Sequence, residues 1–456
     1  MGTCMMGSPE EQVRRIKREF PGPITNEPNV ANIKLLLCEE WCINDIDIVL
    51  ISKDSHAYRY LITKPKQNEF TQIVIHVMLP VVPYFKTQAI VSTIEWVQRY
   101  TTLPVPKVLI YDPTGTTQIG FEWIVLEYFR GQELPVAECG EVKWDAVSSE
   151  KKRSLVRQLV AFYSATFDHS LPSTGSLCMG RATGAEEDDK IGVMISPEFY
   201  TQGGRERLVH GPFQHSDEWI QARIEMKQMD CITNPNACIA LRAKRILSRL
   251  KRLRELFFSS LHKEATKLAN CAIGPENIIM NHNRLVGVVG WEQTYALPLW
   301  KACELPKLLQ GITRTKEPDM KDYLDADDNW LLGAKDDFSK HVRQWERTLL
   351  QEKFLDEMFH KNPSWMAIYK NPLTRMKKDY DIALSSCDNV ACQDAIEKWL
   401  HTVEVGVENI RLQKNSKGID ISILGFIIRS LEDRIFDSEN LSDTARGHAS
   451  GPESRM

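Results

Sequence analysis

The sequence lacks any apolar run long enough to cross a membrane. Of its 456 residues, the most apolar stretches are 73–82, which His76 and Pro80 interrupt, and 421–428, which is short. The N-terminus has no secretory hydrophobic region, and position 6 is not the Ser or Thr that N-myristoylation requires. We therefore expect a cytosolic protein that does not bind membranes.

An excess of charge of one sign is also absent. The 57 Lys and Arg residues nearly balance the 61 Asp and Glu residues, giving a formal net charge of -4, which argues against a nucleic-acid partner. One basic run, residues 244–254, interleaves with apolar residues at helical spacing. We interpret it as the solvated face of a helix, with binding of a polyanion as the alternative.

Paired cysteine spacings typical of zinc sites are missing as well. The eleven cysteines are scattered from Cys4 to Cys392 without such pairs. This usage favours a reducing compartment, and it predicts no metal site built from cysteine.

What is present is an ordinary globular composition, 43% hydrophobic and 26% charged. Short β-rich runs at 46–51, 58–63 and 71–79 are followed by a helical pattern at 87–100. Two more strands are expected at 107–111 and 121–128. The predicted order is strand, strand, strand, helix, strand, strand.

Long helices dominate after Gly131, with the clearest at 150–166, around 246–257 and at 393–412. We therefore predict an α+β fold in which a small antiparallel β lobe precedes a larger helical lobe, with a cleft between them. The predicted boundaries are 1–126 for the β lobe, 127–436 for the helical lobe and 437–456 for a flexible tail.

The stretch 271–311 resembles the aminoglycoside phosphotransferase family, particularly its branch in filamentous fungi. Relatives read H-P-D-L-x-P-x-N-I-L-V, then G-I-I-D-W-E, then L-P-L-W-x-A-C-x-L-P. This chain reads N-C-A-I-G-P-E-N-I-I-M at 270–280, V-V-G-W-E at 288–292 and L-P-L-W-K-A-C-E-L-P at 297–306. Segments 79–87, 103–106 and 120–128 also agree in order, so the resemblance implies a bilobal, protein-kinase-like fold.

The resemblance also implies a degenerate catalytic loop. The family's catalytic aspartate corresponds to Ala272, its histidine two residues earlier to Asn270, and its metal-binding aspartate to Gly290. Asn277 is retained, but a neutral amide alone holds magnesium poorly.

The phosphate-binding positions are altered too. The basic residue expected on the third strand corresponds to His76, and the helix glutamate that would hold it corresponds to Ile90. The loop at 52–56 contains no glycine, and Asp54 there would repel phosphate. Phosphoryl transfer depends on charged groups in fixed places, so we expect little transfer of phosphate from ATP, and neither a metal ion nor another cofactor.

The cleft itself is expected to persist and to take a small, largely apolar ligand, such as a fungal secondary-metabolite intermediate. Its lining, by resemblance, comprises Ile90, Leu126, Tyr128, Asn270, Ala272, Asn277, Gly290 and Trp291. If the protein is an enzyme, metal-free acid–base chemistry such as cyclisation or isomerisation would fall to His76, Glu292, His56 or Glu276. The alternatives are a non-enzymatic pseudokinase that binds a protein partner and a phosphotransferase with residual activity.

Overall fold

A computed structural model describes residues 27–54, 57–64, 72–79, 82, 84–137, 141–178, 190–200, 208–258, 264–282, 284–325, 330–331 and 333–417. The chain divides into two compact units, each built from two segments. The first contains Met1–Ala222 and Ser260–Tyr369, and the second contains Arg223–Ser259 and Lys370–Met456. The lobe boundary predicted after residue 126 falls inside the first unit, whereas His56 and the predicted tail lie outside the described residues.

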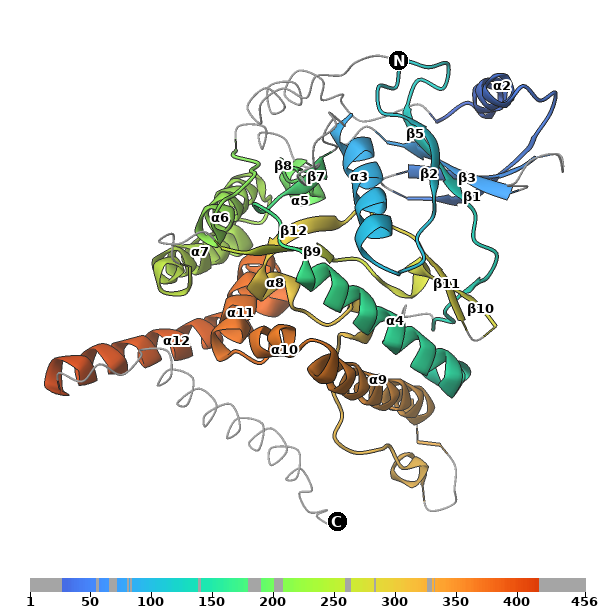
Figure 1. The fold of residues 1–456 in the computed structure, drawn as a ribbon. Coiled ribbons are helices and arrows are strands. Elements are labelled where there is room, and N and C mark those ends of the chain that lie inside the picture. The colour runs from blue at the N-terminus through green and yellow to red at the C-terminus, as the bar shows by residue number, and fades with distance from the viewer. Residues whose placement is uncertain are drawn as a thin grey trace, which may run out of the picture. The chain divides into compact units, whose positions relative to one another are not determined.

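The first unit contains a five-stranded antiparallel sheet, which follows helix α2 (Val30–Trp41) along the chain (Figure 1). Helix α3 (Phe85–Tyr100) follows the third strand, so the predicted order of three strands, one helix and two strands is confirmed, and with it the α+β class. The sheet order is β1-β2-β3-β5-β4. The strands are β1 (Asp47–Lys53), β2 (Ala57–Thr63), β3 (Gln72–Met78), β4 (Val108–Asp112) and β5 (Glu122–Glu127).

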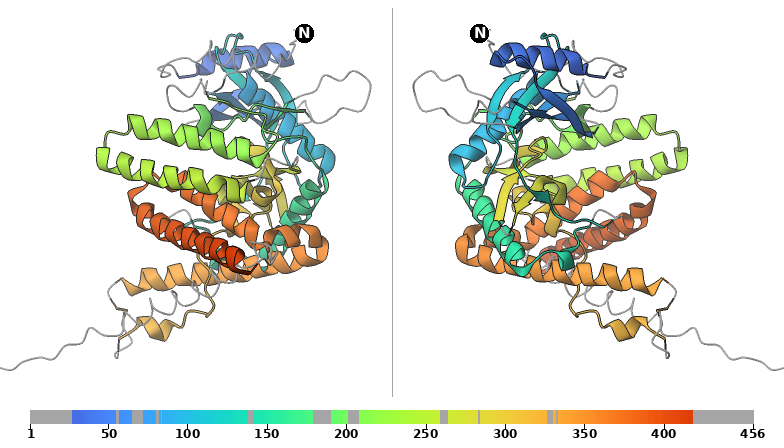
Figure 2. Two further views of the ribbon diagram at one scale, coloured as in Figure 1. Left: turned by 90° about the vertical axis from the view of Figure 1, so that its left-hand side faces the viewer. Right: turned by 90° about the vertical axis from the view of Figure 1, so that its right-hand side faces the viewer.

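The two faces of this sheet have different surroundings. Tyr58, Tyr60 and Ile62 of β2 join a hydrophobic cluster that includes residues of helix α2 (Val30–Trp41), which lies beside the sheet (Figure 2). Because side chains alternate along a strand, Arg59 belongs to the opposite face. His76 is its cross-strand partner on β3 and shares that face.

The remainder of the first unit is mainly helical. Ser148 caps the start of helix α4 (Ser149–Asp168), because its side chain accepts a hydrogen bond from the Lys151 amide. Helix α4 packs beside α9 (Ala334–Lys361). Its other helices and strands are β6 (Gln132–Glu133), a 3₁₀ turn (Trp144–Ala146), α4 (Ser149–Asp168), β7 (Ser176–Cys178), β8 (Lys190–Gly192), α5 (Pro197–Tyr200), β9 (Thr266–Asn270), a 3₁₀ turn (Pro275–Asn277), β10 (Ile278–Asn281), β11 (Arg284–Val288), β12 (Thr294–Pro298), α8 (Leu299–Ala302), 3₁₀ turns (Lys307–Leu309, Met320–Tyr323), α9 (Ala334–Lys361) and α10 (Pro363–Tyr369).

The second unit is built from helices. Helix α6 (Ser216–Thr233) enters it at Arg223, and α7 (Ala237–Phe257) packs against α11 (Pro372–Ser386) and α12 (Val390–Lys417). Buried apolar residues of α7 such as Ile246 and Leu250 form its inner stripe, so the predicted solvated basic helix is present.

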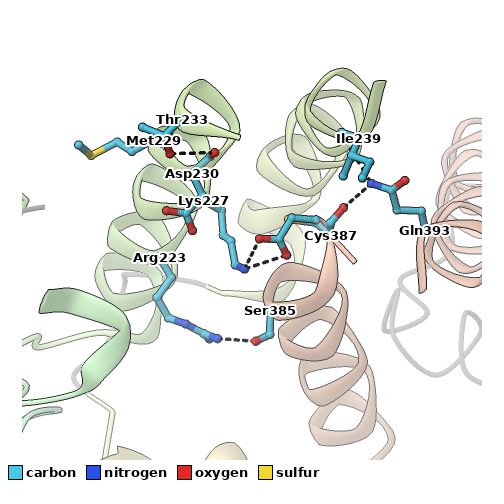
Figure 3. Close-up of polar contacts among 10 residues, drawn as sticks. Arg223, Lys227, Met229, Asp230, Thr233, Ile239, Ser385, Cys387 and Gln393 are labelled. Atoms are coloured by element: carbon cyan, nitrogen blue, oxygen red, sulfur yellow. Dashed lines mark hydrogen bonds and ion pairs between the residues drawn. The ribbon is translucent and has the colours of Figure 1, made fainter. Parts of the chain in front are cut away.

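Polar contacts tie the second unit together (Figure 3). Arg223 forms a buried ion pair with Asp381 and donates to the Ser385 hydroxyl at 2.7 Å. Lys227 reaches both carboxylate oxygens of Asp388 at 3.0 Å.

In the described part of the chain, no helix is sufficiently long and apolar to span a membrane.

Candidate functional site

Arg59 lies at the centre of a group of charged side chains on the face of the sheet opposite to the α2 cluster. Its Nη1 donates to Asp54 Oδ2 at 2.6 Å, and its Nη2 donates to Glu292 Oε1 at 3.3 Å. The side chains of Arg59 and Glu292 are 20% and 14% exposed. A residue of the β sheet is thereby joined to a loop more than two hundred residues later in the chain.

The loop that carries Glu292 is fixed by its neighbours. Gly290 has a φ of 77°, a conformation that favours glycine, and Trp291 is buried in the core. The Trp291 indole donates to the Val288 carbonyl at 3.0 Å. Glu292, the next residue, is therefore held in place against Arg59.

His76 lies beside this ion pair but does not hydrogen-bond to it, since its Nδ1 is 4.0 Å from Glu292 Oε1. Burial, with the positive charge of Arg59 adding to it, lowers the pKa of His76 to about 4. Burial alone would raise the pKa of Glu292, but His76 and Arg59 hold it below its ordinary value. Because His76 is neutral near pH 7, the positive charges that keep Glu292 ionised there are those of Arg59 and Lys86.

Two further titratable groups are buried nearby. Burial lowers the pKa of Lys86, in the first turn of α3, to about 8, and raises the pKa of Glu122, the first residue of β5, to about 7. Glu122 Oε1 accepts a hydrogen bond from the Tyr84 amide at 2.7 Å, and Tyr84 itself has a φ of 71°. Glu122 thus holds an unusual backbone conformation where α3 begins.

In the turn that corresponds to the family's metal site, the side chain of Asn277 is hydrogen-bonded within the turn itself. Asn277 Oδ1 accepts a hydrogen bond from the Gly274 amide at 3.0 Å. A Cβ atom at Gly290 would lie 2.1 Å from Asn277 Nδ2, so no larger side chain fits there without movement. These residues do not fit a magnesium site as they stand, because the amide oxygen is used in the turn and position 290 carries no carboxylate.

The turn corresponding to the catalytic aspartate is similarly self-contained. Asn270, 6% exposed at the end of β9, accepts a hydrogen bond from the Ala272 amide at 2.8 Å through its side-chain oxygen. The Ala272 methyl group can neither accept nor donate a proton. This pair stabilises a turn of the Asx type.

The other predicted residues separate into groups. Ile90, Leu126 and Trp291 belong to the main hydrophobic core, while Tyr128 is half-buried. The structure brings His76 and Glu292 together. Glu276 is exposed, and among the described contacts none joins it to that pair.

Sequence reasoning missed Arg59 and Lys86 as members of this group, and it missed Glu122. Arg59 could have been noticed as a cation within an otherwise apolar strand, since a charge there needs a partner. Lys86 and Glu122 had no comparable signal, because their proximity depends on how α3 meets β5.

An open hollow of about 570 Å³ lies away from this group. Its lining comes from the end of α3, the segment 101–108 and Glu127. It shares no residue with the group around Arg59, so the charged contacts rather than this hollow define the candidate site.

No known protein-family model matches the chain. A subtelomeric hrmA-associated cluster protein of Aspergillus fumigatus, found in two strains, is 25% identical over 123 residues, which make up 26% of this chain and 23% of that protein. The chain therefore spans about a quarter of the length of these curated relatives.

Several solved structures of aminoglycoside phosphotransferases are similar to the chain. A thermostable mutant of APH(4)-Ia in ternary complex with ADP and hygromycin B has a TM-score of 0.42 and 12% identity, covering 81% of this chain and 98% of that one. The gentamicin complex of APH(2″)-IIa has a TM-score of 0.38 and 11% identity, covering 80% and 97%. The ligands in those complexes belong to those proteins.

Proposed function

We propose that this protein is a degenerate, kinase-like member of the aminoglycoside phosphotransferase group that has lost transfer of phosphate from ATP. Its cleft binds, or converts without a metal, a small and largely apolar molecule. The protein acts in the cytoplasm, and the molecule is a fungal secondary-metabolite intermediate. The similarity of about a quarter of the chain to a cluster protein of A. fumigatus supports only the fungal part of this proposal.

The ion pair between Arg59 and Glu292 carries the proposal. In a working phosphotransferase, charged groups at this place must be available to phosphate and metal. Here the cation expected on the third strand is replaced by His76, which is neutral near pH 7, and the neighbouring cation Arg59 of β2 is paired with Asp54 and Glu292. Gly290 cannot be replaced by a metal-binding carboxylate without displacing Asn277.

If the bound molecule is converted, the charge states assign the roles. Neutral His76 and ionised Glu292 are both proton acceptors near pH 7, so neither can act as the acid. Lys86, with a pKa of about 8, still carries a transferable proton there. A cyclisation or isomerisation would therefore use His76 or Glu292 as the base and Lys86 as the acid.

Thermal unfolding with ATP, with and without magnesium, tests the loss of phosphoryl transfer. A ligand present at about a hundred times its Kd stabilises a protein by roughly 2.7 kcal/mol, which a melting curve resolves. We expect no magnesium-dependent rise in Tm at millimolar ATP. A clear rise that EDTA abolishes would contradict the proposal.

Substitution tests the assignment of the base. Once a ligand or product is found by screening apolar metabolites, His76→Ala and Glu292→Ala should each reduce its conversion. Glu276→Gln, at the exposed glutamate, is the matched control and should leave conversion unchanged. Full activity in both cleft variants would show that the site is elsewhere.

A further inference from the structure

The strand β1 (Asp47–Lys53) lies at an edge of the five-stranded sheet. Among the described residues, β1 pairs only with β2, so the backbone groups on its other side have no strand to bond to in that part of the chain. Such an edge is a template for pairing with another strand.

The side chains of β1 are unusually apolar for an exposed edge. Val49, Leu50 and Ile51 are 59%, 50% and 48% exposed. The opposite edge strand, β4, is half-buried along its whole length. Consecutive exposed apolar residues on one edge are the feature that proteins usually avoid unless the edge is covered.

The strand is also complementary to itself in charge. Its sequence begins with Asp47 and ends with Lys53, and Leu50 is its middle residue. In antiparallel pairing with a second copy centred on Leu50, Asp47 of each copy lies opposite Lys53 of the other. The same register sets Val49 opposite Ile51, which joins apolar residues at the centre and opposite charges at both ends.

Two features of β1 bear on the strength of this pairing. Lys53 Nζ is already 2.7 Å from Glu27 Oε1, but both side chains are at least half exposed, and exposed ion pairs exchange partners at little cost. The register with β2 shifts between Leu50 and Ser52, which interrupts a regular ladder. Both features favour a weak contact over a permanent one.

We propose that two copies of this protein associate through β1, in an antiparallel pairing centred on Leu50 that joins their two sheets. The proposal is independent of the function proposed for the cleft. Because the pairing uses one strand of each copy and that strand is irregular between Leu50 and Ser52, we expect the association to be a concentration-dependent equilibrium between monomer and dimer.

Sedimentation velocity of the full chain from about 5 to about 300 µM measures this equilibrium. The variants are Asp47→Lys, the double charge exchange Asp47→Lys with Lys53→Asp, and Leu50→Lys. Leu35→Lys is the matched control, because Leu35 is 50% exposed on α2 rather than on the edge strand. The Tm of each variant shows whether it folds.

We expect wild type and Leu35→Lys to dimerise alike. Asp47→Lys should weaken the dimer about tenfold, because two attractive pairs become two repulsive ones, and Leu50→Lys should abolish it. The double exchange restores opposite charges in the same register and should recover the dimer. A monomeric wild type throughout the range, a dimer insensitive to Leu50→Lys, or a folded double exchange without recovery would each overturn the proposal.

Discussion

Replacement of Glu122 by glutamine should stabilise the protein at alkaline pH. Glu122 is 6% exposed, and burial is the largest cause of its raised pKa. Glutamine keeps the size of the side chain and an oxygen that can accept from the Tyr84 amide, as Glu122 does at 2.7 Å. The substitution removes a carboxyl group that would otherwise lose its proton inside the folded protein as the pH rises.

The magnitude follows from the pKa of Glu122. Burial raises this pKa from 4.5 to about 7, and the difference corresponds to about 3 kcal/mol of unfolding free energy. Between these values the folded state retains a proton that the unfolded state releases, so the stability of wild type falls as pH rises through this window. The free energy of unfolding of Glu122→Gln minus that of wild type should therefore be up to about 3 kcal/mol larger above pH 7 than below pH 4.5.

Urea unfolding at about pH 5 and about pH 8 measures this difference. Glu133→Gln, at an exposed glutamate of β6, controls for the loss of one carboxylate from the protein. If the stability difference between Glu122→Gln and wild type is the same at both pH values, the argument from burial is wrong.

Three further substitutions test other contacts. Gly290→Asp should lower stability by about 2 kcal/mol or more, because a side chain strains the left-handed backbone and collides with Asn277; an unchanged Tm, or a gain of magnesium-dependent ATP hydrolysis, would contradict this account. Asp381→Asn leaves the Arg223 guanidinium buried without its counter-charge and should cost the second unit about 3–5 kcal/mol in urea unfolding; a loss below about 1 kcal/mol would show that water reaches the pair. His76→Gln should make the protein less sensitive to acid, because burial depresses the folded-state pKa of His76 to about 4. The contribution of His76 to the free energy of unfolding is therefore present above about pH 6.5 and is lost as pH falls towards 4. An acid unfolding profile identical to that of wild type would refute this account.

The sheet could be predicted from the sequence because each strand is an apolar run, or an alternation of apolar and polar residues, that is bounded by polar segments. Helix α9 (Ala334–Lys361) was missed for the opposite reason. Its buried face carries polar residues, including Gln344, Arg347, Thr348 and Gln351, so the apolar period that marks a helix is broken. Helix α2 was missed although Asn29 caps its start.

The candidate site could be predicted only in part. The motif match pointed to His76 and Glu292, and the structure brings these two residues together. Arg59 depends on the register that pairs it with His76, and a one-residue slip would move it to the other face. A local sequence pattern cannot predict which residues of two strands pair with each other.

The division of the second unit between two segments has a consequence for biosynthesis. Helix α7 emerges from the ribosome more than a hundred residues before α11 and α12, against which it packs. Until then the apolar stripe formed by Ile246, Leu250 and Leu253 has no α11 or α12 to cover it. A nascent chain that ends after Tyr369 would therefore contain the first segment of this unit without the second, and such an intermediate is a natural substrate for chaperones.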